Sequence, residues 1–214
     1  MEDDEKGALS CKVVLIGESG VGKTSIISRY ITNTFSSILM STTGASFATK
    51  SMYLEKEDRT VKFEIWDTAG QEKYRALARV FYKNASVCIL VYDITRKTSL
   101  EEIKKYWYNE IKANASDNII LALAGNKSDM YEFEEVTDDE GKAYAKEINA
   151  IFQKTSAKTE NGVNELFKMI GQKFVNPDTE NTSNLTKEEQ KKRGEKLKKE
   201  QNNNNNNSKK KICC

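Results

Sequence analysis

The sequence predicts an α/β fold with a mostly parallel sheet covered by helices on both faces. Two observations support this prediction: short apolar runs typical of strands recur along the chain, and segments with helical periodicity separate them. Crossover helices bury both faces of such a sheet. With 214 residues the chain can build one sizeable core, but it is too short for two ordinary domains with linkers.

Six segments are predicted to be strands. Five are apolar runs, at residues 11–16, 61–66, 87–92, 119–124 and 151–153. Residues 47–54 are predicted to add a further strand, because they tolerate β structure and a charged turn separates them from the alternating residues 61–66.

Capping signals predict where helices begin. Glu102 follows Ser99 by three residues and Glu140 follows Thr137 by three, which is the spacing of a capping box. A last helix is expected to begin near Asn161. Apolar stripes predict the buried faces of the first and last of these helices: Leu100, Ile103, Trp107 and Ile111 in one, and Val163, Leu166, Phe167 and Ile170 in the other.

Composition divides the chain into an N-terminal extension (1–10), one folded domain (11–176) and a tail (177–214). The tail begins at Pro177 and has scarcely an apolar residue to bury, so we expect it to be disordered. The acidic N-terminus lacks the apolar run of a secretory signal, and Glu2 argues against myristoylation. Because no apolar stretch approaches the ~20 residues of a spanning helix, we expect a chain made in the cytosol.

The charged and titratable residues exclude several classes of function. The 34 basic and 32 acidic residues leave a net charge of +2, which does not favour a nucleic-acid binder. The absence of histidine excludes histidine-based triads and most zinc sites. Cys11 and Cys88 lie within apolar runs, so we expect buried structural thiols there.

The first chemical motif follows the first predicted strand. Residues 17–24, Gly-Glu-Ser-Gly-Val-Gly-Lys-Thr, match a phosphate-binding loop. Its glycines let backbone N–H groups approach phosphate oxygens, and the next helix adds its positive N-terminal end. Lys23 is expected to reach the β- and γ-phosphates and Thr24 to bind Mg²⁺. A glycine-rich turn can be purely structural, but its position between a strand and a helix favours phosphate binding.

Two later motifs select the nucleotide. Asp67 and Gly70 follow a strand, which places a carboxylate near Mg²⁺ and an N–H near the terminal phosphate. Residues 126–129, Asn-Lys-Ser-Asp, follow another strand, and Asp129 can accept two hydrogen bonds from guanine, whereas adenine lacks both donors. Each motif alone could be an ordinary turn or loop. Their order, each after a predicted strand, favours a GTP site.

These motifs resemble those of the Ras superfamily of small GTPases, from about residue 12 to residue 174. Residues 66–72 and the terminal Cys213 and Cys214 resemble the Rab branch. The resemblance implies a six-stranded sheet with one antiparallel strand, Mg²⁺ as cofactor and a cycle between GTP and GDP. No arginine is evidently placed to act in cis, so slow hydrolysis stimulated by a GTPase-activating protein is expected.

The resemblance also implies roles for individual residues. Gln71 would position the attacking water, and Lys23 and Thr42 would complete the catalytic set. Thr42 would bind Mg²⁺ together with Thr24 and Asp67. Phe35 would flank the guanine, and the Ala157 N–H would meet guanine O6. The full nucleotide-binding set comprises Ser19, Gly20, Val21, Gly22, Lys23, Thr24, Ser25, Phe35, Thr42, Asp67, Gly70, Asn126, Lys127, Asp129, Ser156, Ala157 and Lys158.

Further implied features concern partners. Phe47, Trp66 and Phe81 resemble the aromatic triad that Rabs present to effectors, although they could be core residues. Cys213 and Cys214 resemble the end that geranylgeranyl transferase modifies with Rab escort protein; an exchange factor and a GDP-dissociation inhibitor complete the expected partners. The expected role is vesicular trafficking on the cytoplasmic face of intracellular membranes, with a cytosolic pool and a leaning toward the early endosome.

Three alternatives remain open. A scaffold could bind GTP without cycling, because Thr43 stands where the family usually has isoleucine and residues 36–40 are unusually apolar. A Ras- or Rho-type GTPase is disfavoured because the four-residue prenylation box is missing. An ATP-dependent small-molecule kinase would leave residues 126–129 unexplained.

Overall fold

A six-stranded sheet organises the part of the chain that the computed structural model describes, residues 7–37, 42, 45–68 and 80–177. The strands lie in the order β2-β3-β1-β4-β5-β6. Their bounds are Leu9–Ile16 for β1, Ala45–Leu54 for β2, Arg59–Thr68 for β3, Val87–Asp93 for β4, Ile120–Asn126 for β5 and Ile151–Lys154 for β6. In this sheet β2 pairs antiparallel with β3, and every other neighbouring pair is parallel. The predicted fold class is confirmed.

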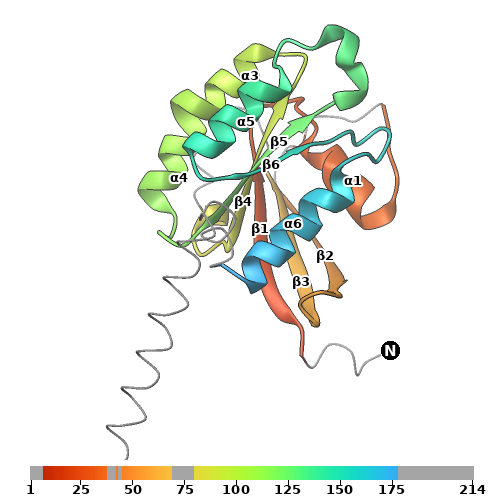
Figure 1. Ribbon diagram of the computed structural model, residues 1–214, viewed down its shortest axis with the longest axis vertical. Coiled ribbons are helices and arrows are strands. Elements are labelled where there is room, and N and C mark those ends of the chain that lie inside the picture. Colours follow the sequence, from red (N-terminus) through yellow and green to blue (C-terminus); the bar gives the residue numbers. More distant parts are fainter. Residues whose placement is uncertain (1–6, 38–41, 43–44, 69–79, 178–214) are drawn as a thin grey trace, which may run out of the picture. The chain divides into compact units, whose positions relative to one another are not determined.

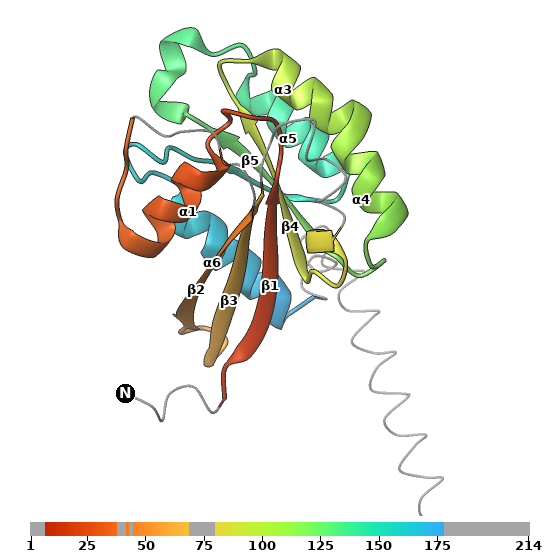
Figure 2. The ribbon, with the colours of Figure 1, turned by 180° about the vertical axis from the view of Figure 1, so that it is seen from behind.

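Helices cover both faces of the sheet. α1 (Lys23–Thr32) and α6 (Val163–Val175) lie on one face, whereas α3 (Lys97–Glu102), α4 (Tyr108–Asn114) and α5 (Asp138–Glu147) lie on the other (Figure 1). Figure 2 shows the same division from behind. A π-helical turn, η3 (Ile103–Trp107), joins α3 to α4, and a 3₁₀ segment, η4 (Ser128–Phe133), follows β5.

Each face of the sheet has its own apolar core. Under α1 and α6, Tyr30 stacks on Phe167 with ring centroids 3.7 Å apart, and Phe63 meets Phe167 edge-on at 5.6 Å. Both predicted apolar stripes are buried as expected. The stripe of α6 belongs to this first core and comprises Val163, Leu166, Phe167 and Ile170. The other stripe belongs to the core on the opposite face and comprises Leu100, Ile103, Trp107 and Ile111. Cys11 and Cys88 are buried free thiols, as predicted.

The two predicted capping boxes have different outcomes. Thr137 caps α5: its hydroxyl accepts a hydrogen bond from the Glu140 N–H, and the Glu140 carboxylate accepts one from the Thr137 N–H. The prediction for Ser99 is wrong, because α3 begins at Lys97 and Ser99 lies inside it. The Ser99 hydroxyl instead bonds the turn before the helix, donating to the Arg96 carbonyl at 2.6 Å.

The topology brings the loops after four neighbouring strands to one edge of the sheet. The carboxyl ends of β1, β4 and β5 are parallel neighbours, and β3 ends beside β1. This is the edge at which parallel α/β sheets bind ligands. The helices that the structure describes include none long and apolar enough to cross a bilayer. Of the predicted tail, residues 177–214, all but Pro177 lie outside the described residues.

Candidate functional site

The loop between β1 and α1 curls around the ammonium of Lys23. Its Nζ donates to the backbone carbonyls of Gly17 and Glu18, each at 2.8 Å. Burial lowers the pKa of Lys23 to about 8, and the negative charge of Asp67 acts in the opposite direction. The loop therefore holds a buried cation at the N-terminal end of α1, where an anion would be favoured.

Glycine is required where the loop enters α1. Gly22 is the N-cap of α1 with φ of 96°, a conformation that favours glycine. A Cβ at this position would collide with the side-chain nitrogen of Asn126. The missing side chain lets Asn126 Nδ2 donate to the Val21 carbonyl at 2.8 Å, which fastens the loop to the end of β5.

Three oxygen-bearing side chains meet beside the first turn of α1. Thr24 Oγ1 donates to Asp67 Oδ2 at 2.6 Å and lies 2.8 Å from Thr42 Oγ1. Asp67 Oδ1 is buried without a hydrogen-bond partner among the described residues. Burial raises the pKa of Asp67, while the hydrogen bond from Thr24 lowers it.

This oxygen cluster fits Mg²⁺. A divalent cation would satisfy the orphaned Asp67 oxygen and offset the cost of burying its charge. One carboxylate and two hydroxyls leave coordination positions for water and phosphate oxygens, which is how Mg²⁺ is usually held. Across the described part of the chain, no group of three or more acidic or cysteine side chains could hold a metal by itself.

The segments after β5 and β6 form a second polar cluster. Asp129 Oδ1 accepts a hydrogen bond from Ser156 Oγ at 2.6 Å, and Lys158 Nζ lies 3.9 Å from Asp129 Oδ2. Asn126 Oδ1 accepts from Thr155 Oγ1 at 3.2 Å and from the Ala157 N–H at 3.3 Å. The contacts of Ser156 and Lys158 orient the Asp129 carboxylate, and those of Asn126 connect the end of β5 to the loop after β6.

Arg29 of α1 binds backbone carbonyls of the loop after β6. Its Nε donates to the Ala157 carbonyl at 2.8 Å and Nη2 to the Lys158 carbonyl at 3.0 Å. Its Nη1 donates to Asn33 at the end of α1. Sequence reasoning did not identify Arg29, because these partners lie up to 129 residues away along the chain.

A cavity of about 400 Å³ joins the two clusters. Most of the predicted nucleotide-binding residues line it: Ser19, Gly20, Gly22, Lys23, Thr24, Ser25, Phe35, Thr42, Asn126, Lys127, Asp129, Ala157 and Lys158. Ser36, Ser37, Thr68 and Met130 also line it and were not predicted. They lie next to or near predicted residues in the sequence, and this proximity could have indicated that they line the same cavity.

The remaining predicted residues fall into two groups. Val21, Asp67 and Ser156 are buried and bond to residues that line the cavity. Gly70, Gln71, Cys213 and Cys214 lie outside the described residues.

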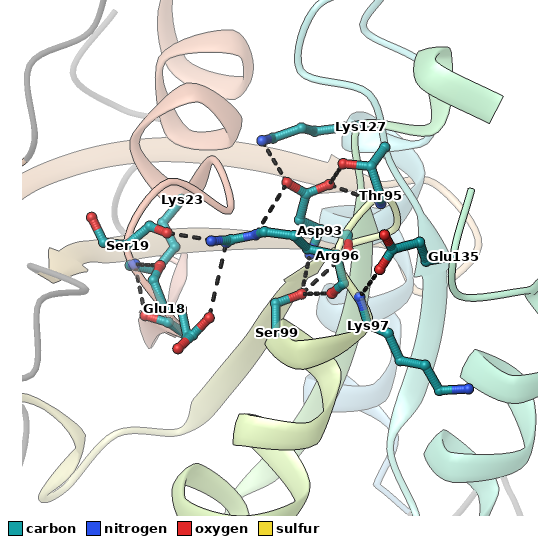
Figure 3. A network of polar contacts seen from close by, with 11 residues as sticks. Glu18, Ser19, Lys23, Asp93, Thr95, Arg96, Lys97, Ser99, Lys127 and Glu135 are labelled. Atoms are coloured by element: carbon teal, nitrogen blue, oxygen red, sulfur yellow. Dashed lines mark hydrogen bonds and ion pairs between the residues drawn. The ribbon is translucent and has the colours of Figure 1, made fainter. Parts of the chain in front are cut away.

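A polar network connects the end of β4 to Lys127 and to the loop between β1 and α1 (Figure 3). Lys127 Nζ lies 2.6 Å from Asp93 Oδ2, and Asp93 Oδ1 accepts hydrogen bonds from the N–H and hydroxyl of Thr95. Arg96 Nε lies 3.7 Å from Asp93 Oδ2, and Arg96 Nη2 donates to the Ser19 carbonyl at 3.1 Å. Sequence reasoning missed Asp93 and Arg96, although an acid at the carboxyl end of a parallel strand was a usable signal.

The three predicted effector residues form a continuous aromatic row. Phe47 on β2 pairs with Trp66 on β3, with ring centroids 4.9 Å apart, and Trp66 lies 5.3 Å from Phe81. Phe47 is 52% exposed, and Trp66 and Phe81 are half-buried. The row is therefore accessible to a partner at one edge of the sheet.

Comparison with known proteins identifies the family. The model of the Ras family matches residues 12–176. The chain belongs to the Ras family. It is 46% identical over 164 residues to the GTP-binding protein ypt5 of Schizosaccharomyces pombe, covering 76% of this chain and 77% of that protein. It is 41% identical over 179 residues to the Ras-related protein RABF2b of Arabidopsis thaliana, covering 84% of this chain and 87% of that protein.

Membership confirms the resemblance to Rab-type small GTPases and, with it, the predicted enzyme class: the chain is a GTP hydrolase. Ras-family GTPases bind GTP and GDP, generally with Mg²⁺. The Rab-type relatives support a role of this GTPase in membrane traffic, which requires regulators and effectors in general.

Proposed function

We propose that the cavity binds GTP and GDP, and that their exchange and hydrolysis switch the recruitment of trafficking effectors. The observation that supports this most strongly is the single cavity that brings Lys23 and Thr24, Thr42 and Asp129 together from three separate segments. Lys23 and Thr24 define its phosphate end, and Asp129 defines its base end.

Guanine selectivity is assigned to Asp129. Ser156 and Lys158 each contact one oxygen of this carboxylate, yet a carboxylate has about four acceptor sites, so both oxygens can still accept hydrogen bonds. The N1–H and exocyclic amine of guanine supply two donors, and adenine supplies neither. The Ala157 N–H, which now makes a long 3.3 Å bond to Asn126, is assigned to guanine O6.

Hydrolysis is assigned to in-line attack of water on the γ-phosphate. Lys23 and the loop N–H groups stabilise negative charge on the transferring group, and Gln71 orients the water. Bound Mg²⁺, held by Thr24, Thr42 and Asp67, would neutralise charge on the phosphates. When the γ-phosphate leaves, Thr42 and Gly70 lose their contacts to it, and the effector surface that includes Phe47, Trp66 and Phe81 changes.

Replacing Asp129 tests the nucleotide assignment. Asp129→Asn should weaken mant-GDP binding by at least about 100-fold, because two hydrogen bonds to a charged acceptor are lost. The same variant should gain affinity for xanthosine diphosphate, whose base offers an acceptor to the new amide. Asp117→Asn, an equal change at an exposed position, is the matched control. Unchanged mant-GDP affinity in Asp129→Asn, or equal binding of mant-ADP by the wild type, would contradict the assignment.

Membrane attachment is assigned to geranylgeranyl groups on Cys213 and Cys214, added by the transferase with Rab escort protein. Two lipid chains give stable anchoring, and residues 209–211, three lysines, add attraction of roughly 1 kcal/mol each at an anionic surface. The early endosome is the proposed compartment. Deletion of both cysteines should move the protein from membranes to the soluble fraction, and retained membrane binding would refute the anchor.

A further inference from the structure

The turn at the carboxyl end of β4 fixes the backbone of Arg96. The Arg96 N–H donates to the Asp93 carbonyl at 3.0 Å, and the Ser99 hydroxyl donates to the Arg96 carbonyl at 2.6 Å. The Ser99 oxygen also accepts from the Asp93 N–H at 3.0 Å. Asp93 and Ser99 are almost fully buried, so the base of the Arg96 side chain is held by an ordered framework.

From this base, the Arg96 side chain extends to Glu18 and Ser19 of the phosphate loop (Figure 3). Nη2 donates to the Ser19 carbonyl at 3.1 Å and lies 4.0 Å from Glu18 Oε2. Ser19 and Gly20 line the cavity, whereas Arg96 is not among its lining residues. The Arg96 side chain is 42% exposed, so its ion pair with Glu18 contributes little, and the bond to the carbonyl is the contact that fixes geometry.

The planar peptide bond between Ser19 and Gly20 transmits this contact into the cavity. In a trans peptide the C=O and the following N–H point in opposite directions, and the described residues contain no cis peptide bond. A Ser19 carbonyl held outward by Arg96 therefore directs the Gly20 N–H inward. Gly20 has φ of 77°, a conformation that glycine adopts without strain, so the flexible backbone at this position depends on neighbouring contacts for its orientation.

We propose that Arg96 is a positioning residue for phosphate binding: by holding the Ser19 carbonyl, it aims the Gly20 N–H at the nucleotide phosphates. This inference rests on the proposed binding of a nucleoside diphosphate or triphosphate in the cavity. Sequence analysis had not placed Arg96 near the site, and the proposal assigns it a role there. Arg96 acts through the backbone and does not touch the phosphate.

The test measures mant-GDP dissociation and the amide resonance of Gly20 in ¹⁵N-labelled, GDP-bound protein. Arg96→Met should accelerate dissociation about threefold to tenfold, the range expected for one lost hydrogen bond. It should also move the Gly20 amide proton upfield, because that proton loses alignment with a phosphate oxygen. Arg96→Lys keeps a donor for the Ser19 carbonyl and should recover part of both effects.

Lys97→Met is the matched control, because Lys97 is the next residue, loses the same charge and faces Glu140 instead of the loop. Lys97→Met should change neither the rate of mant-GDP dissociation nor the Gly20 amide resonance. The proposal is overturned if Arg96→Met matches the wild type, if Lys97→Met has the same effect, or if dissociation accelerates while the Gly20 resonance stays in place. Failure of the wild type to bind GDP would instead refute the proposed function.

Discussion

Lys23 shows how burial prepares one side chain for an anionic ligand. Its ammonium is almost fully buried and donates to two backbone carbonyls, and the negative charges of Asp67 and Glu18 act on it as well. Desolvation is the largest influence on it and lowers its pKa to about 8. Phosphate oxygens at this position would favour the charged form and raise the pKa again.

A pH dependence of nucleotide binding follows from this shift. The free protein loses the Lys23 proton above about pH 8, whereas the phosphate-bound protein keeps it. Binding should therefore take up close to one proton near pH 9 and much less at pH 7, and affinity should fall by up to about tenfold per pH unit in the alkaline range. Calorimetric titration of nucleotide-free protein with GDP, in two buffers of different ionisation enthalpy, measures this uptake. No uptake near pH 9 would contradict the assignment of Lys23 to the phosphates.

Among the helices, α5 begins with the most complete set of local signals. The Thr137 hydroxyl and the Glu140 carboxylate each satisfy a backbone N–H at its first turn. Asp138, Asp139 and Glu140 place negative charge at the positive end of the helix. The Glu140 pKa is lowered mainly by its bond to the Thr137 backbone N–H. A lowered pKa means that the negatively charged form is favoured at this end of the helix, as expected.

Removal of this cap should destabilise the folded domain. Thr137→Ala should lower the free energy of unfolding by about 1 kcal/mol, because the Glu140 N–H loses its acceptor. Thr98→Ala, the same change at an exposed position inside α3, should alter it by less than about 0.5 kcal/mol. Urea unfolding of the GDP-bound protein compares the two. Equal effects would show that the capping bonds contribute nothing specific.

Elements whose signals are local in the sequence could be predicted, and those that depend on distant contacts could not. The glycines and Lys23 of the phosphate loop lie within eight residues, so this short motif was enough to predict the loop between a strand and a helix that joins β1 to α1. The Ser99 prediction failed because the same spacing fits a capping box and a residue inside a helix, and the preceding turn decided between them. Arg96 reaches a carbonyl 77 residues away, a contact that no spacing rule contains.

For the whole molecule, the sheet order is what assembles the site. β1 lies between β3 and β4, and β5 lies beside β4, so motifs far apart in the sequence end at one edge. The antiparallel β2 extends the sheet past β3 and carries Phe47 next to Trp66. The proposed nucleotide site and the proposed effector surface therefore share β3, which supplies both Asp67 and Trp66. This shared strand offers a physical route from the bound nucleotide to the partner surface.

The central claim is that this chain cycles between nucleotide states by hydrolysing GTP. Single-turnover hydrolysis of GTP with Mg²⁺, comparing the wild type with Gln71→Leu and identifying the bound nucleotide before and after, tests it most directly. The account predicts slow hydrolysis by the wild type that the substitution abolishes, with GTP binding retained in both proteins. Tight GTP binding without hydrolysis in either protein would contradict it and would indicate a scaffold that binds GTP without cycling.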